Sequence, residues 1–377
     1  MGLTSHNWGY AMSSNDTNQT SNKQARDGFF IISMTAWENL FNGAMRDVSE
    51  SEAVRTMAAY LTLCCGTGGD HKTTSWSAGA IRKYAGISQR PAERAIYRLE
   101  LHGCINTIKK PEKNKLPAYK INFFDNNPKE QSTDNIFVPN GVVTGVNGEE
   151  SPLKRLAKYQ DPYVLYLFIR LYGFQDKYLD VIEPSILSTA IETGNNLDAM
   201  EIYNEQGLLK IWATEDESSL SAYPTSNFYD FKSHDDDERF FDERTEKTGL
   251  WGFFYILKGL GLLNEVTYAC NGDRAYRADE IDFICEVGTE KQKALAGAIG
   301  ELGELKHSSI GEELPYYEHY VVLPSTYRKI HFQTFYQLRY RTKLGEARNR
   351  YSEENALYKT MAQSMNKIFK TYEKQPQ

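Results

Sequence analysis

The sequence of 377 residues predicts an α+β protein that is mainly helical. Apolar residues recur at helical spacing in several segments, and short alternating segments typical of strands follow them. Breaks in composition separate these segments into domains. Hydrophobic residues make up 41% of the chain and charged residues 25%, which is typical of soluble globular proteins with a core of ordinary size.

The composition divides the chain into four parts. The N-terminus is rich in Ser, Asn, Thr and Gln without periodicity, which predicts disorder. A polar run from Asp125 to Asp134 indicates a linker. The predicted parts are a disordered leader (1–25), a first domain (27–125), a second domain (135–285) with an acidic insertion (215–246), and a mixed, helical C-terminal region (286–377) that is helical from about Phe332.

Several classes of protein are excluded by what the sequence lacks. No apolar stretch approaches the roughly 20 residues of a membrane span, and the N-terminus lacks a signal-peptide pattern. The five cysteines have no CxxC spacing, which indicates reduced thiols in a cytoplasmic protein. No GxxxxGK[ST] or HExxH motif occurs, and the acids from His234 to Glu238 are expected to be solvated. We therefore expect no enzymatic activity, cofactor, metal or membrane contact.

Charge is distributed unevenly along the chain. The net charge is −7, yet Asp70 to Lys120 holds 11 Lys or Arg against 4 Asp or Glu. Residues 321–350 hold 7 Lys or Arg against 1 Glu, whereas residues 215–246 hold 3 against 11. Because a local basic surface matters more for nucleic-acid binding than the total charge, two regions remain candidates for such a surface.

The first domain begins with a predicted helix whose start is marked by Ser49 and Glu52, a pair that fits the capping-box pattern. Helical spacing then gives this helix one buried face, formed by Val54, Met57, Ala58 and Leu61. The glycine-rich segment 66–69 ends the helix. A short strand is expected at Thr73 to Trp76.

A helix-turn-helix follows. Ser77 is expected to cap a short helix that runs to Tyr84, and Gly86 suits a turn position with positive φ, with Ile87 buried beneath the turn. Ser88 is expected to cap a third helix that runs from Gln89 to about His102. Its inner face is Ala92, Ala95, Ile96 and Leu99, and its outer face is Gln89, Arg90, Glu93, Arg94, Tyr97 and Arg98.

A hairpin completes the first domain. Cys104 to Ile108 alternates like a strand, Tyr119 to Phe123 is its return strand, and 109–117 is a basic tip. The segments 80–90 (AIRKYAGISQR) and 95–105 (AIYRLELHGCI) resemble the winged helix-turn-helix superfamily, over about a quarter of the chain. Its members include bacterial transcription regulators and the replication initiators of phages and plasmids.

The resemblance implies that the third helix enters the major groove of double-stranded DNA. Arginine can bind guanine, and glutamine can bind adenine, through paired hydrogen bonds. The implied DNA-binding residues are Ser88, Gln89, Arg90, Arg94, Tyr97 and Arg98 in the helix and Lys109, Lys110, Lys113 and Lys115 in the wing. The alternative is a solvated helix face on which Glu93 pairs with the arginines.

The order of segments in the second domain predicts a degenerate winged helix. Helices are expected at Pro162 to Phe174, Glu183 to Ile191 and Thr248 to Leu260, followed by strands at 261–266 and 275–284. This domain has no row of arginines, so it suits dimerisation or docking of another protein.

Near the C-terminus, basic residues alternate with aromatic ones, which suits a second nucleic-acid surface. The basic residues are Arg328, Lys329, Arg339, Arg341 and Lys343. A helix with its aromatic side chains in the core and its cations in water explains the pattern equally well.

The sequence thus favours a sequence-specific DNA-binding protein that acts in replication initiation or transcription regulation of a bacterial mobile element. A homodimer, and a protein partner of the second domain or acidic insertion, are further expectations. The opposing hypothesis is a protein-interaction or assembly module that uses a winged helix scaffold without reading DNA; the acidic insertion and the negative net charge favour it.

Overall fold

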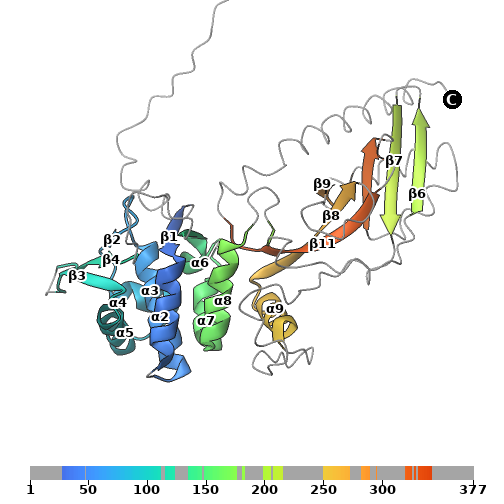
Figure 1. Ribbon diagram of the computed structural model, residues 1–377. Coiled ribbons are helices and arrows are strands. Elements are labelled where there is room, and N and C mark those ends of the chain that lie inside the picture. Colours follow the sequence, from blue (N-terminus) through green and yellow to red (C-terminus); the bar gives the residue numbers. More distant parts are fainter. Residues whose placement is uncertain are drawn as a thin grey trace, which may run out of the picture. The chain divides into compact units, whose positions relative to one another are not determined.

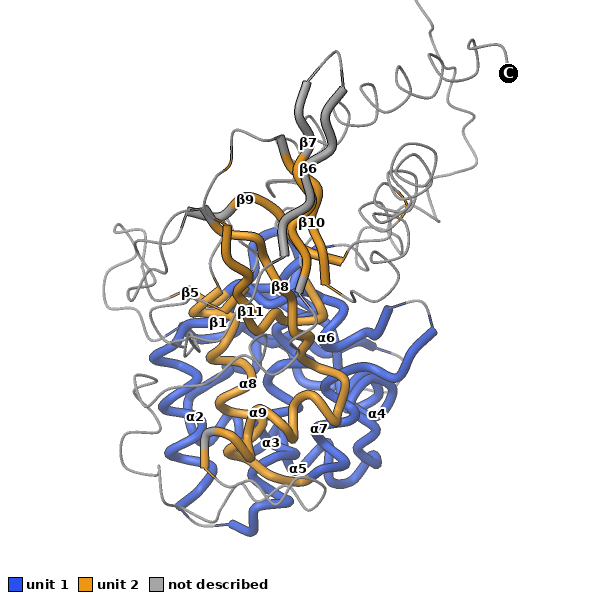
Figure 2. The backbone as a smooth tube through the Cα atoms, turned by 90° about the vertical axis from the view of Figure 1, so that its right-hand side faces the viewer, with its two compact units in different colours: residues 1–131, 137–159 blue, residues 132–136, 160–377 orange. Residues whose placement is uncertain are grey.

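The computed structural model is an α+β protein of helices and small antiparallel sheets (Figure 1). It describes residues 28–46, 48–111, 115–123, 135–146, 148–175, 181–182, 198–204, 207–214, 249–271, 282–288, 294, 319–324, 327 and 330–341. The chain forms two compact units, one of residues 1–131 and 137–159 and one of residues 132–136 and 160–377 (Figure 2). The predicted leader and acidic insertion lie outside the described residues. In the described part of the chain, no helix combines the length and apolar character that crossing a membrane requires.

The first unit contains helices, one three-stranded sheet (β2-β4-β3) and one pair of strands (β1-β5). Its elements are β1 (Phe29–Ser33), α2 (Met34–Arg46), α3 (Glu50–Cys65), β2 (Thr73–Thr74), α4 (Ala78–Ala85), α5 (Gln89–Leu101), β3 (Ile105–Lys109), β4 (Ala118–Ile121), β5 (Asn135–Pro139, from Phe137 on), α6 (Gly141–Thr144) and α7 (Pro152–Tyr159). The sequence therefore predicted α3, α4 and α5 in the correct order, but it did not predict β1 or α2.

Helix α3 is the centre of this unit. It contacts α2, α4, α5, α7 and β1, and every residue from Ala53 to Cys65 except Arg55 is buried. The sequence predicted a single buried face. The additional burial comes from α2, whose Trp37 stacks on Tyr60 with ring centroids 6.3 Å apart. Burial raises the pKa of the Tyr60 hydroxyl and raises the pKa of the Cys65 thiol to about 12.

The predicted helix caps have different outcomes. The Ser77 hydroxyl accepts a hydrogen bond from the Gly79 amide at 3.3 Å, so this cap is confirmed. The capping box at Ser49 is wrong, because the Ser49 side chain makes no capping bond, although α3 begins at the next residue. Ser88 also precedes its helix without a side-chain capping bond. At both helix starts it is the backbone carbonyl, not the side chain, that accepts: the Ser49 carbonyl from the Glu52 and Ala53 amides, and the Ser88 carbonyl from the Ala92 amide.

The turn between α4 and α5 is as the sequence predicted. Gly86 has a φ of +72°, and Ile87 is buried beneath the turn. Helix α7 supports this turn from outside: the Ser151 hydroxyl donates to the Tyr84 carbonyl at 3.2 Å, and a Cβ on Gly86 would lie 3.3 Å from the Lys154 Cε. Residues 137–159 thus pack with the first unit, whereas composition alone placed them at the start of the second domain.

The hairpin after α5 forms a three-stranded antiparallel sheet with β2, in the order β2-β4-β3. Ile105 pairs with Ile121, and Thr107 pairs with Tyr119. The register then shifts between Thr107 and Lys109, so Ile108 is an additional residue in β3. Such a bulge redirects the side chain of the additional residue and bends the strand.

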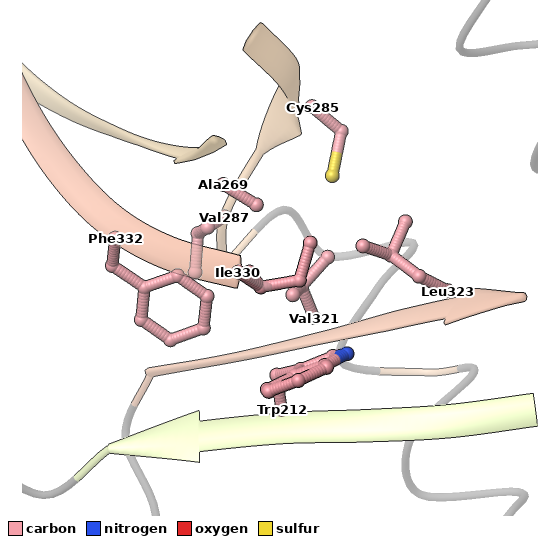
Figure 3. Close-up of a cluster of buried hydrophobic side chains, with 8 residues drawn as sticks. All are labelled: Trp212, Ala269, Cys285, Val287, Val321, Leu323, Ile330 and Phe332. Carbon is pink, nitrogen blue, oxygen red and sulfur yellow. The ribbon is translucent and has the colours of Figure 1, made fainter. Parts of the chain in front are cut away.

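The second unit is rich in strands within the described residues. It contains α8 (Pro162–Gly173), β6 (Asp198–Asn204), β7 (Gly207–Thr214), α9 (Gly249–Gly259), β8 (Leu263–Asn271), β9 (Asp282–Glu286), β10 (His319–Pro324) and β11 (Ile330–Leu338). The strands form two sheets with the orders β10-β7-β6 and β11-β8-β9. A buried apolar cluster joins side chains of both sheets, with Trp212 of β7 and Val321 of β10 beside Ile330 and Phe332 of β11 (Figure 3).

This unit differs from the sequence prediction in three ways. The segment from Ile330 is a strand with all nine residues buried, so the helix expected from about Phe332 is wrong there. β8 pairs along its whole length with β11, a partner that the sequence did not predict. The return strand expected at 275–284 overlaps β9, which pairs with β8 as expected. Strands β6, β7 and β10 were not predicted. The helix expected at 183–191 lies outside the described residues.

Candidate nucleic-acid interface

Helix α5 has one buried and one exposed side. Its buried residues are Ala92, Ala95, Ile96 and Leu99, as the sequence predicted. Directly opposite, at spacings of four, three and four residues, lie four exposed side chains that we call the outward stripe: Arg90, Arg94, Tyr97 and Leu101. The stripe is cationic in the first half of the helix and apolar in the second, where Tyr97 is 67% and Leu101 70% exposed.

Arg98 lies beside this stripe rather than in it. Its guanidinium Nη2 is 3.0 Å from Oε2 of Glu52 in α3, and only 23% of the Arg98 side chain is exposed. Arg94 is 3.9 Å from the same carboxylate and remains 63% exposed. The sequence had placed Arg98 with Arg94 on the outer face and suggested Glu93 as the partner. The structure instead uses Glu52 to hold Arg98 against α3.

The start of α5 is also exposed. Ser88, Gln89 and Arg90 are all solvent-accessible. The Gln89 amide nitrogen donates to the Glu93 carboxylate at 2.7 Å, one helical turn further on. This bond fixes the Gln89 side chain and leaves Arg90 as the exposed cation at the helix start. An exposed helix N-terminus of this kind also attracts phosphate groups.

The hairpin adds cations to the same unit. Lys109, Lys110 and Lys115 are exposed, and Lys113 lies outside the described residues. Lys120 on β4 is exposed too. The sequence motifs did not place it among the candidates, although its strand position between buried Tyr119 and Ile121 indicates an outward side chain. Two apolar residues are exposed here as well, Ile108 at 61% and Leu116 at 67%.

Helix α4 carries a further cation that the sequence motifs did not single out. The Lys83 ammonium lies 4.8 Å from the centroid of the Tyr84 ring. Tyr84 in turn stacks on Trp76, with centroids 4.8 Å apart and an interplanar angle of 15°. Lys83 itself is exposed. The stack therefore holds a cation at the surface of the helix that precedes α5.

The second basic patch is mostly outside the described residues, which include only Arg339 and Arg341 of its five cations; Arg328, Lys329 and Lys343 are not described. The neighbouring aromatic residues Phe332, Phe335, Tyr336 and Tyr340 are buried. The Tyr172 hydroxyl donates to the Tyr340 carbonyl at 2.9 Å, which ties this segment to α8. These aromatic rings belong to the core, so they do not form a platform on which bases could stack.

Among the residues that the structure describes, no group of three or more His, Cys, Asp or Glu side chains is arranged to hold a metal ion. The acids at 234–238 lie outside the described residues. Comparison of the chain with models of protein families, with curated proteins and with solved structures finds no match. The geometry of the first unit is therefore the basis for proposing a function.

Proposed function

We propose that the first unit is a winged helix-turn-helix domain that binds double-stranded DNA in a sequence-specific manner. The order α3, β2, α4, α5, β3, β4, with the sheet order β2-β4-β3, supports this proposal. In this proposal α4 and α5 are the helix-turn-helix, and the β3–β4 hairpin is the wing. The whole chain is then a non-enzymatic, cytoplasmic replication initiator or transcription regulator of a bacterial mobile element.

The outward stripe of α5 is the observation that carries the proposal. A helix with its side chains is about 10–12 Å across, and the major groove is about 12 Å wide. Arg90 and Arg94 stand one turn apart on the exposed side, where they can reach guanine edges or phosphates. The exposed lysines of the wing then contact the sugar-phosphate backbone. Arg98 is held by Glu52 and contributes less directly.

The experiment measures duplex binding by a variant that combines Arg90→Ala and Arg94→Ala. Removal of each arginine costs about 1–3 kcal/mol of binding free energy, so affinity should fall by at least about 30-fold. The slope of log affinity against log salt should become shallower by about 0.9 for each phosphate that the variant leaves without a cation. The matched control combines Arg46→Ala on α2 with Lys158→Ala on α7, two exposed cations on other helices. Equal affinity of the two variants would refute the proposal.

The alternative is a protein-interaction module, and the apolar half of the outward stripe favours it. Tyr97 and Leu101 are two large exposed side chains one turn apart, the kind of pair that packs into a partner's groove. If this alternative holds, Tyr97→Ser with Leu101→Ser abolishes association with the partner or with a second copy, and Arg90→Ala with Arg94→Ala has little effect on duplex binding. Sizing in solution then reports a homodimer directly.

A further inference from the structure

The wing combines apolar and cationic side chains in a way that phosphate contact alone does not require. Ile108 and Leu116 are among the most exposed large apolar residues that the structure describes. They occur on the two arms of one hairpin, where Lys109 and Lys110 follow Ile108 and Lys115 directly precedes Leu116. An exposed isoleucine or leucine gains nothing from water, whereas the neighbouring cations are attracted to a polyanion.

The backbone of β3 directs Ile108 outward. Thr107 pairs with Tyr119 and Lys109 pairs with Ala118, so Ile108 is the residue that the bulge inserts between two regular pairs. Ile108 lies three residues after the buried Ile105, so the alternation of side chains along a strand places it on the opposite face, where it is 61% exposed. The bulge bends β3 at this point, and Ile105, Tyr119 and Ile121 remain buried.

We propose that the wing inserts the Ile108 and Leu116 side chains into the minor groove of the bound duplex and bends it. This inference rests on the proposed function. Apolar side chains that enter the minor groove unstack a base step and kink DNA by roughly 20–90°. The adjacent lysines bring the hairpin to the phosphates on either side of the groove. The protein therefore changes the shape of its target as well as recognising its sequence.

The charge pattern favours DNA over a protein as the occupant of this surface. A protein-docking patch is typically depleted in lysine at its centre. Here lysine directly follows Ile108 and directly precedes Leu116. Pyrimidine–purine steps unstack most easily, so the preferred site should place such a step under the wing.

The test first recovers a bound duplex from a random pool with the wild-type protein, and then measures its bend by the mobility of fragments in which the site is moved from the end to the middle. The variant combines Ile108→Ser and Leu116→Ser. Both side chains are exposed, so the core is preserved. The control is Val146→Ser, an exposed apolar residue of the same unit outside the hairpin.

We expect the wild-type protein and the control to bend the duplex alike, and the double variant to lose at least about half of the bend angle while still forming the complex. A complex that is straight with the wild-type protein, or equally bent with the double variant, overturns this inference and leaves the proposed function intact. Failure to recover any bound duplex overturns both.

Discussion

Replacing Glu52 with glutamine should have opposite effects on stability and on DNA binding. Glu52 of α3 lies 3.0 Å from the Arg98 guanidinium and 3.9 Å from that of Arg94. The carboxylate thus joins α5 to the centre of the first unit, and at the same time it neutralises a cation beside the outward stripe. Glu52→Gln keeps the size of the side chain and removes only the charge.

The magnitude follows from distance and burial. Two unit charges about 3 Å apart attract by roughly 5 kcal/mol at an effective dielectric constant of about 20, before desolvation is subtracted. Fully exposed pairs retain about 0–1 kcal/mol. Because only 23% of Arg98 and 27% of Glu52 are exposed, we expect a loss of about 1–2 kcal/mol in the free energy of unfolding. The midpoint of thermal unfolding should fall by about 2–8 °C, because a unit of this size loses about 2–4 °C for each kcal/mol.

DNA affinity should rise in the same variant. Arg98 loses its partner and becomes available to a phosphate, so the slope of log affinity against log salt should steepen by about 0.9. Urea unfolding and duplex titration over a salt series measure both effects on the same protein samples.

The control is Glu50→Gln, which removes an exposed carboxylate from the same first turn of α3. If the two variants bind DNA equally well, the effect is one of overall charge and the role of the Arg98 pair is refuted. An unchanged stability of Glu52→Gln would likewise contradict the reasoning.

Two further predictions concern backbone conformation and thiol chemistry. Gly86→Ala should destabilise the protein by about 1–2 kcal/mol because φ is +72° there. Gly79→Ala should stabilise it by about 0.5–1 kcal/mol, because this exposed site lies in the first turn of α4 and the added Cβ would meet only the Ser77 Oγ at 3.5 Å. Shifts of the urea unfolding midpoint in the same direction for both variants would contradict this. Burial raises the pKa of Cys65 and Cys104 to about 12. Their thiolate fraction at pH 8 is therefore about 10⁻⁴, and they should react with a disulfide reagent only after denaturation. Rapid reaction of either thiol in the native protein would show that it is not buried.

The elements of the first unit that the sequence predicted are those defined by local patterns. Ser77, Gly86 and Ile87 determine the helix-turn-helix within about ten residues, and each has the expected conformation or burial. The capping box failed at both of its bonds. The Glu52 amide donates to the Ser49 carbonyl at 2.9 Å, not to the Ser49 hydroxyl. The Glu52 carboxylate is paired with Arg98, a residue on another helix, and such a competing partner is invisible in the local pattern.

The second unit shows the opposite case. Strand β11 is buried on both faces, and the alternation of apolar and polar residues from Ile330 to Gln333 is interrupted at Thr334 and Phe335, so its sequence gives only a short strand signal. His331 and Gln333 are buried together with Phe332. The alternating basic and aromatic residues around it then suggested a helix. Only the pairing with β8, whose residues lie 59 (Ile330 and Asn271) to 75 (Leu338 and Leu263) positions earlier in the sequence, defines this segment as a strand.

The packing of α7 against the helix-turn-helix has a practical consequence. A fragment that stops near residue 125, where the composition changes, would omit Val138, Leu153 and Leu156, all of which are buried. It would also remove the Ser151 bond to Tyr84 beneath the turn that orients α5. A shortened protein intended for crystallisation or for DNA titration should therefore extend through Tyr159, because an earlier stop would leave apolar side chains of the remaining helices in water.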